Sequence, residues 1–320
     1  MAKYLVTGIA GFIGSSLCHA LLERGDSVRG VDNFATGCRE NIAGVLHLID
    51  FREADLLDMK ALRDACADMD YVLHQAAIPS VPKSVADPYT SNRANVDGTV
   101  NLLIAAHDAG VKRVIYAASS SAYGNQPTLP KHEAMMPDPI SPYAVSKLAG
   151  ELYMKSFHHC YGLETVCLRY FNIFGPRQDP DSPYSAVLAK FITLMLAGKQ
   201  PTIYGDGEQS RDFTYVQNAV EANLLACVAP AERAVGKVFN VATGRCFTLN
   251  ETFAILKELT GYSGGPAYAA ERAGDVKHSL ADITEARQCL GYSPSVDFRE
   301  GLRRTVEWYR RTASRNTAAS

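Results

Sequence analysis

Short runs of β-branched and other apolar residues alternate with helix-length segments through the first half of this chain, and this alternation restricts the fold more than any other feature. Strands separated by segments of that length pair in parallel, with crossover helices on both faces of the sheet. The sequence therefore predicts an α/β fold built on a doubly wound parallel sheet. The predicted strands are residues 3–7, 27–31, 46–50, 71–74, 113–117 and 165–170.

Two long helices are predicted among these strands, at residues 87–109 and 142–161, because apolar residues recur there at helical spacing. Gly110 and Gly162 are the expected C-terminal stops. After residue 172 the pattern changes to turn-rich pieces between shorter helices and strands, which indicates a smaller α+β domain.

The boundary between the two predicted domains is not a single cut. Residues 212–226 and 238–241 predict a further helix and strand that return to the first sheet. We therefore expect a first domain at 1–172 plus 212–243, a second at 173–211 plus 244–312, and a flexible polar tail at 313–320.

Composition excludes several classes of protein. The 320 residues carry 32 Lys and Arg against 34 Asp and Glu, with no basic run, so no nucleic-acid partner is expected. No stretch approaches eighteen uninterrupted apolar residues and the first predicted strand begins at Lys3, so neither a membrane partner nor an export signal is expected. The 8 cysteines lie far apart, which predicts no metal site, no disulfide framework and a cytoplasmic location.

Three glycines at intervals of three lie directly between the first predicted strand and a helix. In dinucleotide-binding loops the first permits a tight turn, the second lets a pyrophosphate approach the backbone, and the third lets the helix pack on the strand. This context on both sides favours a phosphate-binding loop over glycines kept only for packing. The residues expected to meet the pyrophosphate are Gly8, Gly11, Phe12, Ile13 and Gly14.

Acidic residues follow the second and third predicted strands. Asp32 ends the second, where a carboxylate would bind both ribose hydroxyls and repel a 2′-phosphate, so NAD is expected rather than NADP. Asp55 and Leu56 are placed to meet the adenine edge, although an ordinary helix cap at Asp55 is an equal interpretation.

Tyr143 and Lys147 lie one turn apart on the predicted helix 142–161, and Pro142 suits its first position. A lysine ammonium near a phenol favours the phenolate, as would a nicotinamide cation, so a group with an ordinary pKa of about 10 could act as a base near neutrality. Ser119 ends the fifth predicted strand, at the edge where such sheets bind ligands, and can hydrogen-bond the same hydroxyl.

Together these residues resemble the extended short-chain dehydrogenase/reductase family, specifically its nucleotide-sugar 4-epimerase branch. The resemblance covers nearly the whole chain, through residues 7–14, 32–34, 74–77, 95, 119–124, 143 with 147, 168–172, 210–213 and 272–275. It implies a Rossmann domain that keeps a tightly held NAD. The further residues it assigns to the cofactor are Asn33, Gln75, Ala76, Ala77, Asn95 and Tyr170, of which Asn95 and Tyr170 could instead be buried and satisfied.

The resemblance also implies the reaction and its substrate. Tyr143 would take the proton from the sugar O4 while hydride passes from C4 to the nicotinamide, and the resulting 4-keto sugar would turn before hydride returns to its opposite face. Asn172, Arg211 and Arg272 would meet the UDP diphosphate and neighbouring sugar, and Asp275 the uridine ribose. The family commonly dimerises through its two long helices, so a homodimer is expected.

Related dehydratases carry an acidic pair where this chain has Ser120 and Ser121, and related decarboxylases carry a glutamate that is absent between 119 and 124. Ser279 is a small residue where glucose-only epimerases carry a bulky tyrosine, so we expect UDP-GlcNAc and UDP-GalNAc to interconvert, with UDP-glucose and UDP-galactose tolerated. UDP-glucose epimerisation as the main activity, or another NAD-dependent nucleotide-sugar oxidoreduction, is the alternative. Ser80, Ser120 and Ser121 could contact the sugar, or merely cap nearby backbone.

Overall fold

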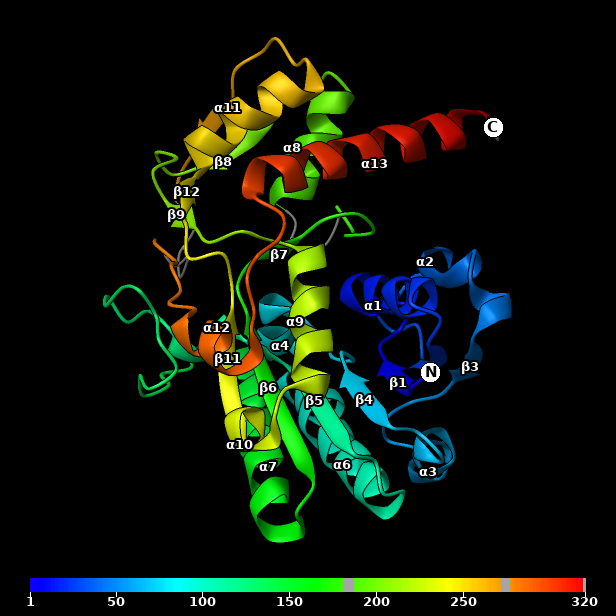
Figure 1. The fold of residues 1–320 in the computed structure, drawn as a ribbon. Coiled ribbons are helices and arrows are strands. Elements are labelled where there is room, and N and C mark those ends of the chain that lie inside the picture. Colours follow the sequence, from blue (N-terminus) through cyan, green and yellow to red (C-terminus); the bar gives the residue numbers. More distant parts are fainter. Residues whose placement is uncertain (181–186, 272–276, 319–320) are drawn as a thin grey trace.

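The computed structural model describes residues 1–180, 187–271 and 277–318 (Figure 1). Within these ranges the largest sheet has seven parallel strands in the order β11-β6-β5-β4-β1-β2-β3, which confirms the predicted doubly wound α/β fold. The strands are β1 (Lys3–Thr7), β2 (Ser27–Asp32), β3 (Asp50–Glu53), β4 (Tyr71–His74), β5 (Arg113–Ser119), β6 (Glu164–Tyr170) and β11 (Lys237–Val241). Because the strand order reverses between β1 and β4, a crevice is expected at the carboxyl ends of these two strands.

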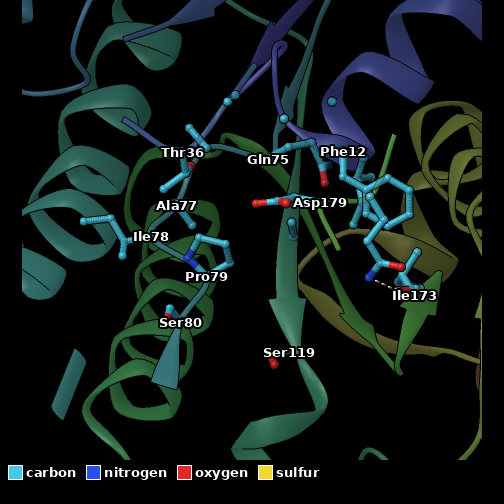
Figure 2. Close-up of a pocket in the computed structure, with 18 of the residues that line it drawn as sticks. Phe12, Thr36, Gln75, Ala77, Ile78, Pro79, Ser80, Ser119, Ile173 and Asp179 are labelled. Carbon is cyan, nitrogen blue, oxygen red and sulfur yellow. Dashed lines mark hydrogen bonds between the residues drawn. The ribbon is translucent and has the colours of Figure 1, made fainter. Parts of the chain in front are cut away.

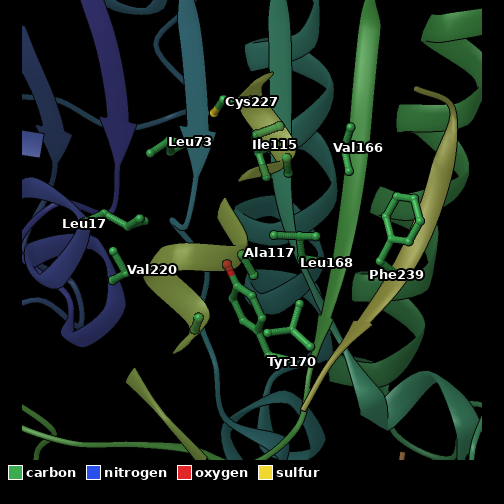
Figure 3. Packing of buried hydrophobic residues seen from close by; sticks show 14 of the residues in the cluster. Leu17, Leu73, Ile115, Ala117, Val166, Leu168, Tyr170, Val220, Cys227 and Phe239 are labelled. Carbon is green, nitrogen blue, oxygen red and sulfur yellow. The ribbon is translucent and has the colours of Figure 1, made fainter. Parts of the chain in front are cut away.

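Helices cover both faces of this sheet (Figure 1). On one face, Leu17 of α1 (Phe12–Glu23) and Val220 of α9 (Val216–Val228) pack with strand residues such as Ile115 and Leu168 (Figure 3). The other face is covered by α3 (Met59–Cys66), α6 (Gly98–Asp108) and α7 (Pro142–Tyr161). Shorter helices complete this lobe: α2 (Glu40–Ala43), α4 (Val81–Ala86), α5 (Pro88–Asn92), α10 (Ala231–Ala234) and α12 (Thr284–Leu290).

A second, smaller lobe gathers at one end of the sheet (Figure 1). It contains α8 (Val187–Leu196), α11 (Leu249–Thr260) and α13 (Phe298–Ala318) around an aromatic core, in which the rings of Phe213 and Phe298 stack with centroids 5.2 Å apart. Its strands form short pairs, β10 with β7, β12 with β9 and β13 with β8. They are β7 (Ile173–Phe174), β8 (Thr202–Tyr204), β9 (Ser210–Arg211), β10 (Thr214–Tyr215), β12 (Phe247–Thr248) and β13 (Ala267–Ala269).

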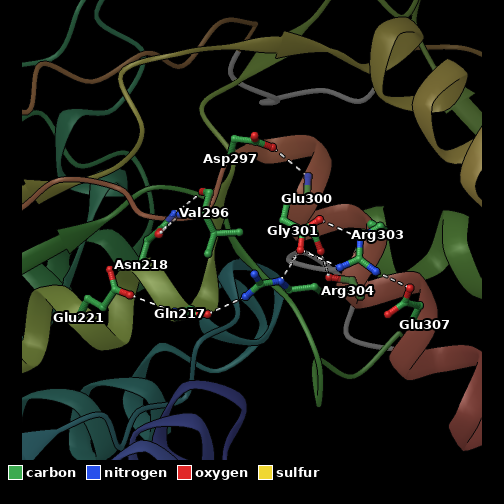
Figure 4. Close-up of polar contacts among 11 residues, drawn as sticks. Gln217, Asn218, Glu221, Val296, Asp297, Glu300, Gly301, Arg303, Arg304 and Glu307 are labelled. Atoms are coloured by element: carbon green, nitrogen blue, oxygen red, sulfur yellow. Dashed lines mark hydrogen bonds and ion pairs between the residues drawn. The ribbon is translucent and has the colours of Figure 1, made fainter.

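Polar contacts join the two lobes where α13 approaches α9 (Figure 4). The Asn218 amide on α9 donates to the Val296 carbonyl at 2.8 Å and accepts the Val296 N–H at 3.0 Å. Arg304 on α13 donates to the Gln217 side-chain oxygen at 2.9 Å. As the sequence predicted, α9 and β11 lie in the first lobe, where β11 pairs with β6.

The third predicted strand is wrong in position. Leu46–Leu48 form a 3₁₀ turn with both leucine side chains exposed, and β3 begins only at Asp50. β3 lies at the edge of the sheet, where β2 is its one partner among the described strands, so it needs no continuous apolar run.

A predicted helix and the predicted tail also differ in detail. A π-helical turn at Arg93–Asp97 interrupts the stretch predicted at 87–109. α13 continues to Ala318, beyond residue 312, where the polar tail was expected to begin. The hydroxyls of Thr312 and Ser314 bond carbonyls one turn back, at Trp308 and Arg310, so these small polar residues fit the helix.

Candidate active site

A cavity of about 1170 Å³ runs across the carboxyl ends of β1, β2, β4 and β5 and continues into the second lobe. That volume exceeds the 300–1,000 Å³ typical of a site for one small molecule, so it suits two ligands side by side. In Figure 2, Ser119 lies at the carboxyl end of β5, and residues 77–80 line the same space from the loop after β4.

The glycine loop fits a phosphate group. Gly8 has φ +67°, and a Cβ there would lie 2.7 Å from the Ala76 backbone, while a Cβ on Gly14 would lie 2.1 Å from the Gly8 carbonyl oxygen. α1 begins at Phe12 with Gly11 as its N-cap, and no side chain caps it, so its first-turn amides remain open to an anion. All five predicted loop residues line the cavity: Gly8, Gly11, Phe12, Ile13 and Gly14.

Asp32 is fixed at the edge of this loop. Its carboxylate accepts the Ala10 N–H at 2.9 Å and the Phe34 N–H at 2.8 Å. Burial raises the pKa of Asp32, and these backbone hydrogen bonds oppose that rise. The carboxylate lines the cavity where the ribose of a dinucleotide would lie one loop away from its pyrophosphate.

A side-chain contact between the residues that follow β2 and β3 closes the side of the cavity where the adenine is predicted to bind. The Asn33 side chain donates to the Asp55 carboxylate at 2.8 Å, and both residues line the cavity together with Leu56. Asp55 also accepts the Leu57 N–H at 2.9 Å within a local turn, whereas the N-cap of α3 is Asp58, so Asp55 is not the helix cap that the alternative interpretation expected.

The loop after β4 forms the opposite wall, with Gln75, Ala76 and Ala77 in the lining. The Gln75 side chain accepts the Tyr170 hydroxyl at 3.2 Å and donates to Asn223 at 3.2 Å. Asn223 in turn donates to the Tyr170 oxygen at 2.7 Å. Tyr170 therefore lines the cavity, and its hydroxyl also has hydrogen-bond partners within the protein. Asn223, which supplies one of them, was not predicted from the sequence.

Asn95 does not line the cavity, in contrast to the role that the resemblance implied. It is 1% exposed, and its amide accepts the Ile78 N–H at 2.8 Å and donates to the Ile78 carbonyl at 3.3 Å and the Ser146 hydroxyl at 3.0 Å. Because every polar atom of this amide is occupied, the alternative interpretation of a buried, satisfied residue fits. Asn95 connects the cavity loop to α7.

Ser119, Tyr143 and Lys147 all line the cavity. Burial raises the pKa of Tyr143, and a hydrogen bond with Ser119 opposes that rise. Lys147 is 4% exposed, with Nζ 4.7 Å from the Tyr116 ring centroid, and burial lowers its pKa to about 8. Burial outweighs the hydrogen bond with Ser119, so the pKa of Tyr143 stays above its ordinary value.

The start of α7 is held from two sides. The Ser141 hydroxyl accepts the Ala144 N–H at 3.2 Å, and the fully buried Ser84 hydroxyl on α4 accepts the Tyr143 N–H at 3.0 Å. Ser84 was not predicted from the sequence, because a serine in a short helix gives no sign of the distant amide that it will bind.

The remaining predicted residues lie on the side of the second lobe or near it. Asn172 and Arg211 line the cavity, as do Ser80 and Ser120. The Ser80 hydroxyl also caps α4 by accepting the Lys83 N–H at 3.3 Å.

Ser121 and Ser279 are outside the lining. The Ser121 hydroxyl donates to Ser119 at 2.8 Å, so it acts on that serine rather than on the cavity. The Ser279 N–H donates to the Ser210 carbonyl at 3.0 Å, next to Arg211. Arg272 and Asp275 lie outside the described residues.

Comparison with known proteins agrees with this geometry. Residues 4–242 match the sequence pattern of the NAD dependent epimerase/dehydratase family. The chain belongs to this family. It is 38% identical over 313 residues to a UDP-glucose 4-epimerase of Mycolicibacterium smegmatis, covering 96% of this chain and 98% of the relative.

Solved structures give the same assignment. A UDP-N-acetylglucosamine 4-epimerase from Methanobrevibacter ruminantium in complex with UDP-N-acetylmuramic acid is 44% identical, with a TM-score of 0.91 over 97% of this chain and 99% of that one. A Thermus thermophilus UDP-glucose 4-epimerase in complex with NAD is 37% identical, with a TM-score of 0.86 over 96% and 99%. The cofactor of this family member is NAD. No helix in the described ranges is both long and apolar enough to cross a lipid bilayer.

Proposed function

We propose that this chain interconverts UDP-N-acetylglucosamine and UDP-N-acetylgalactosamine by inverting C4 of the hexose. The chain is an NAD-dependent nucleotide-sugar 4-epimerase. Our proposal is that its substrates are the acetylated sugars. One observation carries the chemistry: the cavity joins the glycine loop to the wall that bears Arg211, and Ser119, Tyr143 and Lys147 line it between them.

Bound NAD would accept a hydride from C4 of the sugar and give it back. Tyr143 as the phenolate takes the proton from O4 and becomes the neutral phenol, and Ser119, which lowers the pKa of Tyr143, stabilises the phenolate before that transfer. Lys147 adds a positive charge from one turn away on the same helix. Because burial raises the pKa of Tyr143, its deprotonation depends on these two groups and on the positive nicotinamide.

The nucleotide is gripped at the second lobe. Arg211 and Asn172 line that end of the cavity and suit a diphosphate and its neighbouring sugar, since an arginine fork matches phosphate oxygens. By their match to the family motif, Arg272 and Asp275 complete this grip at the diphosphate and the uridine ribose. A firm hold on the nucleotide leaves the hexose free to turn.

The segment after Ser119 favours epimerisation over elimination of water or loss of carbon dioxide. Ser120 and Ser121 begin a 3₁₀ turn, Ser120–Tyr123, and neither can serve as an acid at neutral pH. Dehydration and decarboxylation need a further proton-transfer group at this place. The hydroxyl of Ser120, which lines the cavity, instead suits a hydrogen bond to the sugar.

The choice of sugar rests on Ser279, whose backbone lies beside the strand of Arg211. A small side chain at this position leaves space for an acetamido group. UDP-glucose 4-epimerisation as the main activity is the second candidate, because the relative from M. smegmatis carries that name.

The test mixes the purified protein with UDP-GlcNAc or UDP-glucose, without added NAD, and follows the C4 configuration by NMR. We expect both C4 epimers of the acetylated sugar to appear. Ser279→Tyr should abolish turnover of UDP-GlcNAc and spare UDP-glucose, with Ser279→Ala as the matched small variant. Unchanged turnover of UDP-GlcNAc by Ser279→Tyr would show that this residue does not select the sugar.

A homodimer in a reducing, cytoplasmic compartment is part of the proposal. The apolar side chains of Val145, Leu152, Tyr153 and Tyr161 are exposed along α7, which suits pairing with a second copy, and all 8 cysteines are free. Light scattering should give a mass near twice 34.8 kDa, and Leu152→Glu should shift it toward the monomer. A monomeric wild-type protein would contradict this pairing.

A further inference from the structure

Asp212 follows β9 directly, next to Arg211, and its side chain accepts four hydrogen bonds. It is 0% exposed. One carboxylate oxygen accepts the Thr243 N–H at 2.9 Å and the Thr243 hydroxyl at 2.7 Å. The other accepts the Gly244 N–H at 3.0 Å and the Ala281 N–H at 3.3 Å. Burial raises the pKa of this carboxyl, and its four donors oppose that rise by favouring the ionised form.

These hydrogen bonds bring together parts of the chain that are far apart in sequence. The side chain of Asp212 holds the turn at Thr243 and Gly244 and the segment around Ala281. Its backbone carbonyl accepts the Asn172 amide at 3.0 Å. Asn172 and the preceding residue, Arg211, both line the cavity. Asp212 is thus bonded to one of these two lining residues and adjacent to the other.

The segment 277–282, which we name the wall strip, lies along β9. The Ser210 N–H donates to the Lys277 carbonyl and the Ser279 N–H to the Ser210 carbonyl, both at 3.0 Å. The Arg211 guanidinium donates to the same Lys277 carbonyl at 3.1 Å. Any shift of the wall strip therefore moves an acceptor of the Arg211 side chain.

At its far end the wall strip is attached to a separate loop. The Lys131 N–H donates to the Leu280 carbonyl and the Asp282 N–H donates to the Lys131 carbonyl, both at 2.8 Å. The hydrogen bond from the Ala281 N–H to Asp212 lies between these two contacts in sequence. Asp212 therefore ties the far end of the wall strip to the segment that follows β9, while the Ser210 hydroxyl lies 2.9 Å from His278 Nδ1 nearer the start of the strip.

We propose that Asp212 is a positioning residue for the nucleotide end of the substrate, whose buried carboxylate aligns Arg211, Asn172 and the wall strip without touching the substrate. This inference rests on the proposed function, because it assumes that Arg211 meets a UDP diphosphate. A carboxylate suits the place because it offers acceptors alone, and all four of its partners here are donors.

Two variants test this role to different degrees. Asp212→Asn keeps the shape but turns one acceptor into a donor that faces two other donors, so Kd for UDP and KM for UDP-GlcNAc should each rise about tenfold. Thr243→Val removes a single hydroxyl donor from the carboxylate, and Kd for UDP should rise about threefold. In both variants kcat and the amount of NAD that copurifies should stay near the wild-type values, because the glycine loop and Tyr143 are untouched.

The matched control is Tyr292→Phe. The buried Tyr292 hydroxyl donates to the Ala242 carbonyl at 2.9 Å, one residue before Thr243, and is not among the four donors to the Asp212 carboxylate. Its loss should lower the melting temperature and leave Kd for UDP unchanged. If the role of Asp212 were purely structural, all three variants would have a lower melting temperature and an unchanged Kd for UDP.

Isothermal titration with UDP, combined with steady-state kinetics, separates the outcomes. Weaker UDP binding in Asp212→Asn and Thr243→Val, with unchanged binding in Tyr292→Phe, supports the positioning role. If Asp212→Asn does not fold, Thr243→Val decides, and a Kd equal to that of the wild type overturns the inference. A wild-type protein that binds no UDP refutes the proposed function itself, which is a distinct result.

Discussion

The charge on Lys147 depends on a buried carboxylate one turn further along α7, and this dependence gives a pH prediction. Glu151 is 4% exposed and accepts two hydrogen bonds from Arg169 on β6, at 2.9 and 2.8 Å. Burial lowers the pKa of Lys147 to about 8, while Glu151 and, more weakly, Cys167 oppose that lowering. Glu151→Gln should therefore make Lys147 lose its proton at a lower pH.

The magnitude follows from the helix geometry. Side chains one turn apart are separated by about 6 Å, and two unit charges at that distance in an effective dielectric of about 20 interact by about 3 kcal/mol, or about two pKa units. Since Lys147 must be protonated to act, wild-type activity should fall above pH about 8. In Glu151→Gln this alkaline limb should move down by about one to two units.

The assay is kcat at saturating UDP-GlcNAc from acid to alkaline pH. Other titratable groups face Lys147, namely Tyr143 on its own helix, Tyr116 on β5, Cys167 on β6 and His74 on β4. Burial lowers the pKa of His74 to about 3, so it stays neutral across the assay.

Two further variants control for the loss of the ion pair. Glu151→Asp keeps the negative charge and should keep the alkaline limb in place. Glu151→Gln with Arg169→Met removes both buried charges and should show the same shift without an unpaired guanidinium. An alkaline limb that stays at its wild-type pH in both charge-removing variants would refute the reasoning.

Three other predictions concern the cofactor loop, the base and the buried ion pair. Gly14→Ala places a methyl group 2.1 Å from the Gly8 carbonyl oxygen, so the protein should purify without NAD, as measured by absorbance of the released nucleotide; a full NAD content would contradict the tight loop. Tyr143→Phe should lower kcat by about 10² to 10⁴-fold with NAD content unchanged, and near-native turnover would exclude Tyr143 as the base. Arg169→Met alone leaves Glu151 as an unpaired buried charge and should lower the free energy of unfolding by about 3–5 kcal/mol in urea denaturation, more than the double variant does.

Local patterns in the sequence were sufficient for much of the first lobe. The boundaries of β1 and β4 and of α7 agree with the predictions, because an apolar run in a central parallel strand and a Pro–Gly-bounded helix are both local signals. The edge strand β3 was displaced because its residues are polar and it pairs on one side only. Its position depends on β2, which a local pattern does not include.

In the candidate site, too, residues within short motifs were predictable from the sequence and residues with distant partners were not. The glycine loop, Asp32, and Tyr143 with Lys147 lie within short motifs, and the structure brings them to one cavity. Ser84 and Asn223 act through partners about 50 residues away or more, so residue type alone gave no indication of their contacts. Asn95 shows the converse, since its motif implied a cofactor contact and the structure gives it bonds to Ile78 and Ser146.

The chain leaves the sheet after β6, builds part of the second lobe, returns as α9 and β11, leaves for α11, returns as α12 and leaves again for α13. Neither lobe is therefore one continuous stretch of sequence. An exchange of substrate specificity between relatives cannot be made by splicing a cassette at one junction, because every such junction would divide the walls of the cavity. New sugar preferences in this scaffold have to arise by point changes in short segments such as 277–282.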